Sequence, residues 1–395
     1  NSPWGKAEWT RDDLPAPGAA LAGKKIVDPR EKSDTARGIY PSLEAALAEA
    51  KPGDEIAVRC NGELVVRQTQ FIKGGASVTI RRADRSYHPI LVLDRDPDGP
   101  QAALFCVQGG QLNLESLEFR LRPKDSRFDA QAVAKLGGDG TVTFKDCVVT
   151  LDGRDTTKPL AAVLLPDYRE AMLQPGAAGA PKVLFDTCFV RGDGDLVLAW
   201  ASRPFEVEVR ESLVALKGSL LDVDLGSREA PAAAGQQEVL RLDRVTAYLG
   251  GHLARLKAAK LTSLIPLHCT PVKSLLVSAG DRKALLHVEA GPAKAPDTAR
   301  ALVPWKGQGN NYANFSPMLD QQPGGNEGTF PATSDDWKAA DTGSKSDEVK
   351  FAERLWPDPD SEVSLADLTP AALDPKAGPK DVGVNTSKLP ALGSD

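Results

Sequence analysis

Residues 144–149 read FKDCVV and residues 185–190 read FDTCFV, so one pattern of an apolar residue, two polar residues, a cysteine and a second apolar run occurs twice. Weaker copies lie at residues 114–119, 209–214 and 242–247. Successive copies start 30, 41, 24 and 33 residues apart, in the range where repeats indicate stacked solenoid units or propeller blades. The repeat therefore predicts an architecture built from one recurring supersecondary unit.

The sequence around the repeat consists of short β-prone runs. From about residue 55 to residue 288, runs of four to six mostly apolar residues alternate with turn residues, as in EIAV at 55–58 and TVTF at 141–144. The 35 glycines and 30 prolines leave little room for long helices, which excludes an α-helical bundle. A propeller would show a more constant interval and more aromatic residues than the 6% found here. We therefore expect an all-β chain folded as a parallel β-helix, a solenoid that lengthens by stacking coils.

The cysteines indicate how residues stack in the interior of this solenoid. Cys147 and Cys188 occupy the same position of the repeat, where Ser212 is the smaller equivalent. Like residues stack in ladders inside a solenoid, and a free cysteine packs as a small apolar group. Two interpretations stay open: stacked thiols, which we favour, or a disulfide, which a rung spacing of about 4.8 Å would permit between adjacent coils. No Cys-x-x-Cys pair occurs among the five cysteines, so the common zinc and thioredoxin-like motifs are absent.

One amphipathic helix is predicted ahead of the main run of strands. Ser42 is a suitable N-cap for residues 43–50, which read LEAALAEA with one apolar stripe at helical spacing. The Pro-Gly-Asp stretch at 52–54 ends this helix and leads into the first strands. We expect the helix to cap the N-terminal end of the solenoid.

Three segments are expected along the chain. Residues 1–36 form an N-terminal arm with one strand, and residues 37–315 form the parallel β-helix. Residues 316–395 form an acidic, irregular C-terminal extension that packs on the solenoid or caps its open end. The extension has 15 acidic and 7 basic residues, a net charge of −8, which leaves +2 for the first 315 residues.

The charge and hydropathy of the chain argue against nucleic acid as a partner and against a membrane span in this chain. A net charge of −6 argues against nucleic acid, because nucleic-acid binders present a basic face. No apolar run approaches the roughly 18–20 residues of a membrane span, so none is expected in this chain. The chain begins Asn-Ser-Pro without a methionine, and we expect a fragment of a longer protein, with room for a signal or membrane anchor upstream.

The segment at residues 39–56, IYPSLEAALAEAKPGDEI, resembles the entry segment of right-handed parallel β-helix proteins of the pectin-lyase-like class. Residues 61–64 (NGEL) are similar to a turn of that class, and residues 78–83 and 88–91 resemble its next coil. The resemblance covers roughly residues 24–290. It implies a right-handed β-helix entered through a capping helix, and it is much less specific for activity.

A narrower resemblance concerns the C-terminus. The stretches LADL at 365–368 and DVGVN at 381–385 are similar to the ends of β-helix regions of planctomycete proteins, including the extracytoplasmic regions of membrane-spanning serine/threonine kinases. No kinase motif occurs in this chain. The resemblance implies an extracytoplasmic location, periplasmic or at the cell surface, and a sensing or scaffolding role.

Two acidic clusters are the strongest candidates for chemistry. Asp193 and Asp195 flank a glycine, and Asp222 and Asp224 flank a valine, so in a strand the second pair points to one side. They could bind calcium, although a solvated outer face is the interpretation we favour. Trp200 could stack on a sugar ring near Arg203, although packing under a loop is favoured for it.

Other ionisable residues are scattered. The basic residues that could act as the base of a lyase are Lys135, Arg203, Arg210, Arg241 and Arg244, and the four histidines without metal-site spacing are His88, His252, His268 and His287. Residues 191–193 spell the adhesion tripeptide Arg-Gly-Asp, a match too short to carry weight. We predict no catalytic, cofactor-binding or metal-binding residue and no cofactor.

The function predicted from the sequence is a non-catalytic extracytoplasmic binding, sensor or scaffold region whose partner is a polysaccharide or another protein, attached to a membrane-anchored kinase. The alternative is a polysaccharide lyase or glycoside hydrolase acting on acidic polysaccharide, and a self-assembling structural module is the third possibility. A groove holding at least two carboxylates with Arg or Lys within reach would favour the enzyme.

Overall fold

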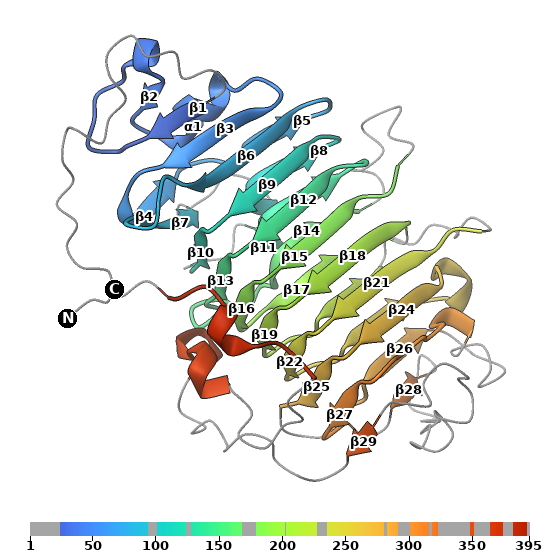
Figure 1. Ribbon diagram of the computed structural model, residues 1–395. Helices are drawn as coiled ribbons and strands as arrows, with labels where there is room; N and C mark the ends of the chain where they lie inside the picture. Colours follow the sequence, from blue (N-terminus) through green and yellow to red (C-terminus); the bar gives the residue numbers. More distant parts are fainter. Residues whose placement is uncertain are drawn as a thin grey trace.

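Three parallel sheets, called A, B and C, run along the molecule, and most coils of the chain add one strand to each (Figure 1). The computed structural model describes residues 24–93, 101–123, 128–167, 179–201, 203–226, 235–279, 283–290, 301–315, 318–322, 348–350, 364–373 and 382–392. Within these ranges all strand pairs are parallel. The chain is therefore an all-β solenoid, a parallel β-helix, as the repeat predicted.

The strands follow one another along each sheet in the order of the coils. Sheet A contains β2 (Ile39–Tyr40), β1 (Lys24–Val27), β3 (Asp54–Val58), β6 (Ser77–Arg82), β9 (Gln111–Glu115), β12 (Thr141–Lys145), β15 (Lys182–Asp186), β18 (Phe205–Arg210), β21 (Glu238–Asp243) and β24 (Leu267–Val272). Sheet B contains β4 (Asn61–Val66), β7 (His88–Leu93), β10 (Glu118–Leu121), β13 (Val148–Leu151), β16 (Phe189–Gly192), β19 (Leu213–Leu216), β22 (Thr246–Leu249), β25 (Leu275–Ser278), β27 (Asn311–Ala313) and β29 (Glu348–Lys350). Sheet C contains β5 (Gln70–Lys73), β8 (Gln101–Gln108), β11 (Ala130–Gly137), β14 (Leu160–Leu165), β17 (Asp195–Ala199), β20 (Leu221–Asp224), β23 (Ala254–Ala258), β26 (Leu286–Ala290) and β28 (Leu319–Gln322).

The apolar core fills the space between the three sheets. Strands β12 and β15 pair so that Phe144 lies beside Phe185, and the two rings stack at a centroid distance of 4.7 Å. Both rings are fully buried. Because a parallel register places like residues of successive coils one above another, the two best copies of the repeat become neighbouring rungs of the core.

The corner between sheets A and B explains the repeat pattern. Asp146, Thr187, Glu211 and Arg244 all have left-handed backbone conformations, with φ of 52°, 55°, 40° and 53°. Each is the third residue of its copy of the repeat and turns the chain from a strand of sheet A into a strand of sheet B. Residues with a Cβ rarely adopt this conformation, so these corners carry local strain that the surrounding ladders impose.

The cysteine column lies just after this corner. Cys147 and Cys188 are buried and not bonded to each other, which confirms the stacked-thiol interpretation. The thiol of Cys188 donates to the carbonyl oxygens of Phe144 (3.3 Å) and Asp186 (3.4 Å). In the next coil the Ser212 hydroxyl accepts from the backbone N–H of Cys188 at 2.9 Å. The small residues of the column therefore satisfy backbone groups that the turn leaves unpaired.

The N-terminal end of the described solenoid carries a helix, whereas strands continue toward its C-terminal end. The predicted helix is α1 (Leu43–Ala48), and the Ser42 hydroxyl accepts from the N–H of Ala45 at 3.2 Å. Beyond residue 315, β28 and β29 continue sheets C and B. The boundaries at residues 36 and 315 stay predictions, and residues 1–23 lie outside the described part.

Three short 3₁₀ helices follow in the C-terminal region: η5 (Leu365–Asp367), η6 (Pro370–Leu373) and η7 (Thr386–Lys388). They are the red ribbon on the outer face of sheet B in Figure 1. Two further 3₁₀ helices, η2 (Thr35–Arg37) and η3 (Leu261–Ser263), lie in turns. Across the ranges given above, the structure has no helix with the length and apolar character that crossing a membrane requires.

Candidate functional site

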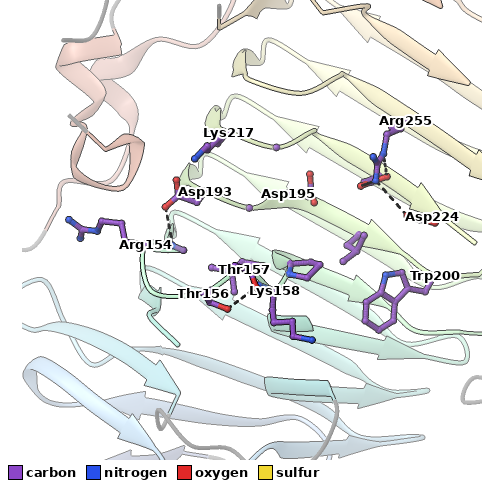
Figure 2. A pocket seen from close by; sticks show the side chains of 17 residues that line it. Arg154, Thr156, Thr157, Lys158, Asp193, Asp195, Trp200, Lys217, Asp224 and Arg255 are labelled. Carbon is purple, nitrogen blue, oxygen red and sulfur yellow. Dashed lines mark hydrogen bonds and ion pairs between the residues drawn. The ribbon is translucent and has the colours of Figure 1, made fainter. Parts of the chain in front are cut away.

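A groove of about 570 Å³ lies at the outer face of sheet C (Figure 2). One wall is the loop of residues 152–159 between β13 and β14, here called the rim loop, and the rest comes from β17, β20 and the turns before them. The ionisable side chains that line it are Asp193, Asp195, Asp222, Asp224, Arg154, Lys158, Lys217 and Arg255. The structure thus brings both predicted acidic clusters into one groove.

An apolar patch forms one end of the groove. Trp200 is 6% exposed and packs with Leu198 in a cluster that is separate from the solenoid core and also contains Ala130, Ala132, Ala161 and Leu164. Both Trp200 and Leu198 line the groove. The favoured expectation of a packed tryptophan is therefore correct, and the same residue also belongs to the wall of the site.

Asp195 is the most perturbed carboxylate that lines the groove. Its Oδ1 accepts from the backbone N–H of Ser219 at 2.6 Å. Burial, and next the negative charge of Asp222, raise the pKa of Asp195 to about 7, against the opposing effects of the Ser219 N–H and Arg255. A carboxyl group with this pKa exchanges a proton near neutral pH, which is the property required of a general acid or base.

Asp222 lies three residues beyond Ser219, on the neighbouring coil. The Arg255 guanidinium donates to it through Nε (2.8 Å) and Nη2 (2.7 Å), because Asp222 and Arg255 are register partners in β20 and β23. Burial raises the pKa of Asp222, and Arg255 opposes this effect. Asp224 is 3.7 Å from Arg255 and 3.8 Å from Lys257, so the far end of the groove is a charge network.

The rim loop carries the cations of the opposite wall. Arg154 binds both oxygens of Asp152, at 2.8 Å and 2.6 Å, and this hydrogen bonding lowers the pKa of Asp152. The carboxylate of Asp193 accepts from the N–H of Gly153 at 3.0 Å. In the described part of the chain, neither Lys158 nor Lys217 has an ion-pair partner. Figure 2 shows Lys158 between Thr157 and Trp200, where its ammonium group can meet a ligand.

The basic residues considered from the sequence lie elsewhere. Arg203 is buried and donates to the Leu136 carbonyl at 2.7 Å, and burial lowers its pKa to about 10. Arg210 and Arg241 pair with glutamates on sheet A, and Arg244 pairs with Glu211 at the corner. Lys135 lies on β11 and does not line the groove. None of these five residues is therefore a component of the groove.

The four histidines and Arg191 of the Arg-Gly-Asp tripeptide do not line the groove. His252 and His287 stack at 4.8 Å, and His287 is 2.9 Å from Asp320, while His88 contacts Glu118 on sheet B. His268 lies in β24 of sheet A. Arg191 is 6% exposed, so it is not available as part of an adhesion motif. Among the residues that the structure describes, no three metal-ligating side chains converge.

The groove cations were missed because they come from separate coils. Arg154 and Lys158 lie in one turn, Lys217 in another and Arg255 in a later strand, at intervals that vary with the turn lengths. The register pair Asp222 and Arg255, 33 residues apart, is visible only once the coils are aligned.

Comparison with family models, curated proteins and solved structures finds no match for this chain. The resemblance to pectin-lyase-like proteins and to planctomycete kinase regions thus stays at the level of the motifs quoted above.

Proposed function

We propose that the chain is a carbohydrate-binding region that holds a polysaccharide with acidic groups in the groove of sheet C. The observation that carries the proposal is the composition of the groove, which Lys158 and Lys217 line together with Asp193, Asp195, Asp222 and Asp224. Ammonium groups suit the acidic groups of a sugar, and carboxylates accept hydrogen bonds from its hydroxyls. Leu198 and Trp200 supply the apolar wall that ligand grooves commonly contain.

The proposal places this region outside the cytoplasm as a sensor or scaffold attached to a membrane-anchored kinase. What supports it is the motif resemblance together with a long, regular surface that lets a polymer lie along several coils. A polymer that crosses neighbouring coils gains affinity from repeated weak contacts.

Binding is tested by calorimetry with an oligouronate and a neutral oligosaccharide of equal length. Lys158→Ala together with Lys217→Ala should weaken oligouronate binding by roughly tenfold or more, since a hydrogen bond to a charged group contributes about 1.5–3 kcal/mol. Lys182→Ala is the matched control, because Lys182 lies on sheet A and pairs with Glu206. The proposal would be contradicted if the double variant and the wild type bound the oligouronate with equal affinity, or if the wild type bound neither sugar.

A second candidate, glycoside hydrolysis, is favoured by the combination named from the sequence, carboxylates in one groove with Arg or Lys within reach: Asp195, with its pKa raised to about 7, lies beside Asp222, which Arg255 binds. Glycosidases use such a pair, with one carboxyl protonated and the other ionised. The test is the release of reducing ends from the same oligouronate. Turnover that Asp195→Asn abolishes while binding persists would establish the enzyme, and binding without turnover would leave the carbohydrate-binding region.

A further inference from the structure

We propose that residues 364–373, here called the C-terminal strap, hold the rim loop of the groove in place, so that strap docking and ligand binding are coupled. The first half of this inference, the mechanical link between the strap and the rim loop, depends only on the contacts described below. The second half rests on the proposed carbohydrate-binding function.

The strap is anchored on the outer face of sheet B by apolar contacts. Leu368 and Leu373 are 8% and 3% exposed, and they pack on side chains from three successive strands: Val148, Phe189, Leu213 and Ala215. No strand pairing joins the strap to sheet B in the residues that the structure describes. The strap is therefore held by side-chain packing and a few polar contacts, which makes its docking a separate equilibrium from the folding of the coils.

Arg191 is the main polar anchor of the strap. It lies on β16, its Nε donates to the Thr150 hydroxyl at 3.1 Å, and its Nη1 donates to the carbonyl oxygen of Leu368. The guanidinium also lies over the ring of Phe189, 5.6 Å from its centroid. Because Arg191 is buried, releasing the strap removes a hydrogen-bond acceptor from a charged group.

The chain continues from this anchor to the groove in two residues. Gly192 has φ of 120°, and a Cβ there would lie 2.0 Å from the carbonyl oxygen of Leu151, so the backbone passes very close to the preceding coil. Asp193 follows and accepts from the N–H of Gly153 in the rim loop at 3.0 Å. The Arg-Gly-Asp tripeptide thus touches the strap with its first residue and the rim loop with its third.

A second contact joins the strap directly to the rim loop. Arg154, held by Asp152, is 3.4 Å from the carboxylate of Asp367 in the strap. Arg154 and Asp367 are both more than half exposed, so this ion pair is weak by itself. It helps to orient the strap, which the packing of Leu368 holds on sheet B. Docking of the strap therefore holds the rim loop at its beginning, at Gly153 and Arg154.

The link has a thermodynamic consequence. If the docked strap favours the groove geometry that a ligand needs, then the ligand protects the docked strap by the same factor, because coupling between two sites is reciprocal. Arg191 acts on the ligand through Asp193 and the rim loop, which makes it a positioning residue, whereas Asp193 also lines the groove itself.

The test uses hydrogen exchange on the full chain without any ligand. Leu368→Asp combined with Leu373→Asp should release the strap and speed exchange in residues 153–160 by about threefold or more. Asp367→Asn, which removes only the direct contact, should leave the strap docked and speed exchange in the rim loop alone. Phe71→Asp is the control, because Phe71 is an exposed apolar residue of β5 on sheet C, outside the cluster that the strap forms with sheet B.

The second measurement is oligouronate affinity by calorimetry. The double variant should bind roughly three- to tenfold more weakly than the wild type, and oligouronate should slow exchange in the strap of the wild type. Unchanged exchange in the rim loop of both the double variant and Asp367→Asn would overturn the link. If the wild type binds no oligouronate while the rim loop still responds to strap release, the proposed function fails and the mechanical link stands.

Discussion

The guanidinium of Arg255 binds both carboxylate oxygens of Asp222, at 2.7–2.8 Å, from the next coil of the solenoid. The two residues are register partners across β20 and β23, so the bond ties neighbouring rungs together through their side chains. Asp222 is almost fully buried, whereas Arg255 retains access to the groove. This pair therefore contributes to stability and to the charge of the site at once.

Arg255→Met should lower the free energy of unfolding by roughly 1–3 kcal/mol, because it leaves the buried carboxylate of Asp222 without its partner. Lys257→Met is the control, since Lys257 makes only partly exposed ion pairs, with Asp224 and Glu289, and the expected loss is below about 1 kcal/mol. Urea unfolding followed by circular dichroism measures both. Adding Asp222→Asn to Arg255→Met should restore part of the loss, and equal losses in the two single variants would contradict the assignment.

Asp195 predicts a pH dependence of stability. Burial raises the pKa of Asp195 to about 7, whereas the pKa of an unfolded aspartate is about 3.9. Between these values the unfolded chain releases a proton that the folded chain keeps, so this contribution to stability is lost as the pH rises from about 4 to about 7. Asp195→Asn removes the effect, and its stability relative to the wild type should grow across that window by roughly 2–4 kcal/mol.

The measurement for Asp195 is urea unfolding of both proteins at several pH values between about 4 and 8. Effects of groups common to both proteins largely cancel in the difference, although the charge on Asp222 also responds to the substitution. Parallel stability curves for the two proteins would show that the pKa of Asp195 is not raised.

Glu238 is a buried acid inside the solenoid, and its removal should stabilise the fold. It is 1% exposed, faces inward between the register partners Phe205 and Leu267, and its Oε1 lacks a hydrogen-bond partner among the described residues. Burial raises the pKa of Glu238 well above its usual value, so its cost to stability grows as the pH rises above about 4.3. Glu238→Leu should raise the melting temperature most at alkaline pH.

Glu208→Leu is the control for Glu238, because Glu208 lies on the outer face of the same sheet and pairs with Arg210. Its effect should stay within about 0.5 kcal/mol and change little with pH. A loss of stability in Glu238→Leu at every pH would mean that the carboxyl group has a structural role in the interior.

The left-handed corners between sheets A and B predict that a threonine-to-glycine substitution stabilises the fold at a corner and destabilises it in a strand. Thr187 is β-branched and has φ of 55°, so Thr187→Gly should relieve strain and stabilise the fold by about 0.5–1 kcal/mol. Thr143 lies in the extended strand β12, where Thr143→Gly should cost about 1 kcal/mol through chain entropy and lost packing. Thermal unfolding compares the two, and a destabilised Thr187→Gly would mean that its hydroxyl, 3.2 Å from Asp186 Oδ1, contributes more than the strain removes.

Much of the fold could be predicted because a coil repeats its own pattern. Phe144 and Phe185 are register partners near the ends of the equivalent strands β12 and β15, and the polar third residue of the repeat, as at Asp146 and Thr187, marks the corner in both coils. Alternation of apolar and polar residues then decides which side chains enter the core. The left-handed backbone at these corners could not be predicted, because neither aspartate nor threonine requires it.

Of the charged residues of the candidate site, only the acidic ones could be recognised in the sequence. Asp193, Asp195, Asp222 and Asp224 stand out as pairs along the chain, and a solvated outer face was the favoured interpretation of them. Their cationic partners lie on other coils, so the groove appears only when β14, β17, β20 and β23 are placed side by side.

By itself, the sequence predicted a solenoid of short parallel strands with Cys147 and Cys188 in one column, because the six-residue pattern of each coil recurs along the chain. The tertiary structure alone decided which coils meet in register and where the C-terminal strap docks. Asp222 meets Arg255 across 33 residues, and Arg154 meets Asp367 across 213. The step from Asp222 to Arg255 equals the 33 residues between the repeat copies at 209 and 242, but their side-chain bond appears only in the structure, and the strap lies outside the repeat, so no pattern indicates where it docks.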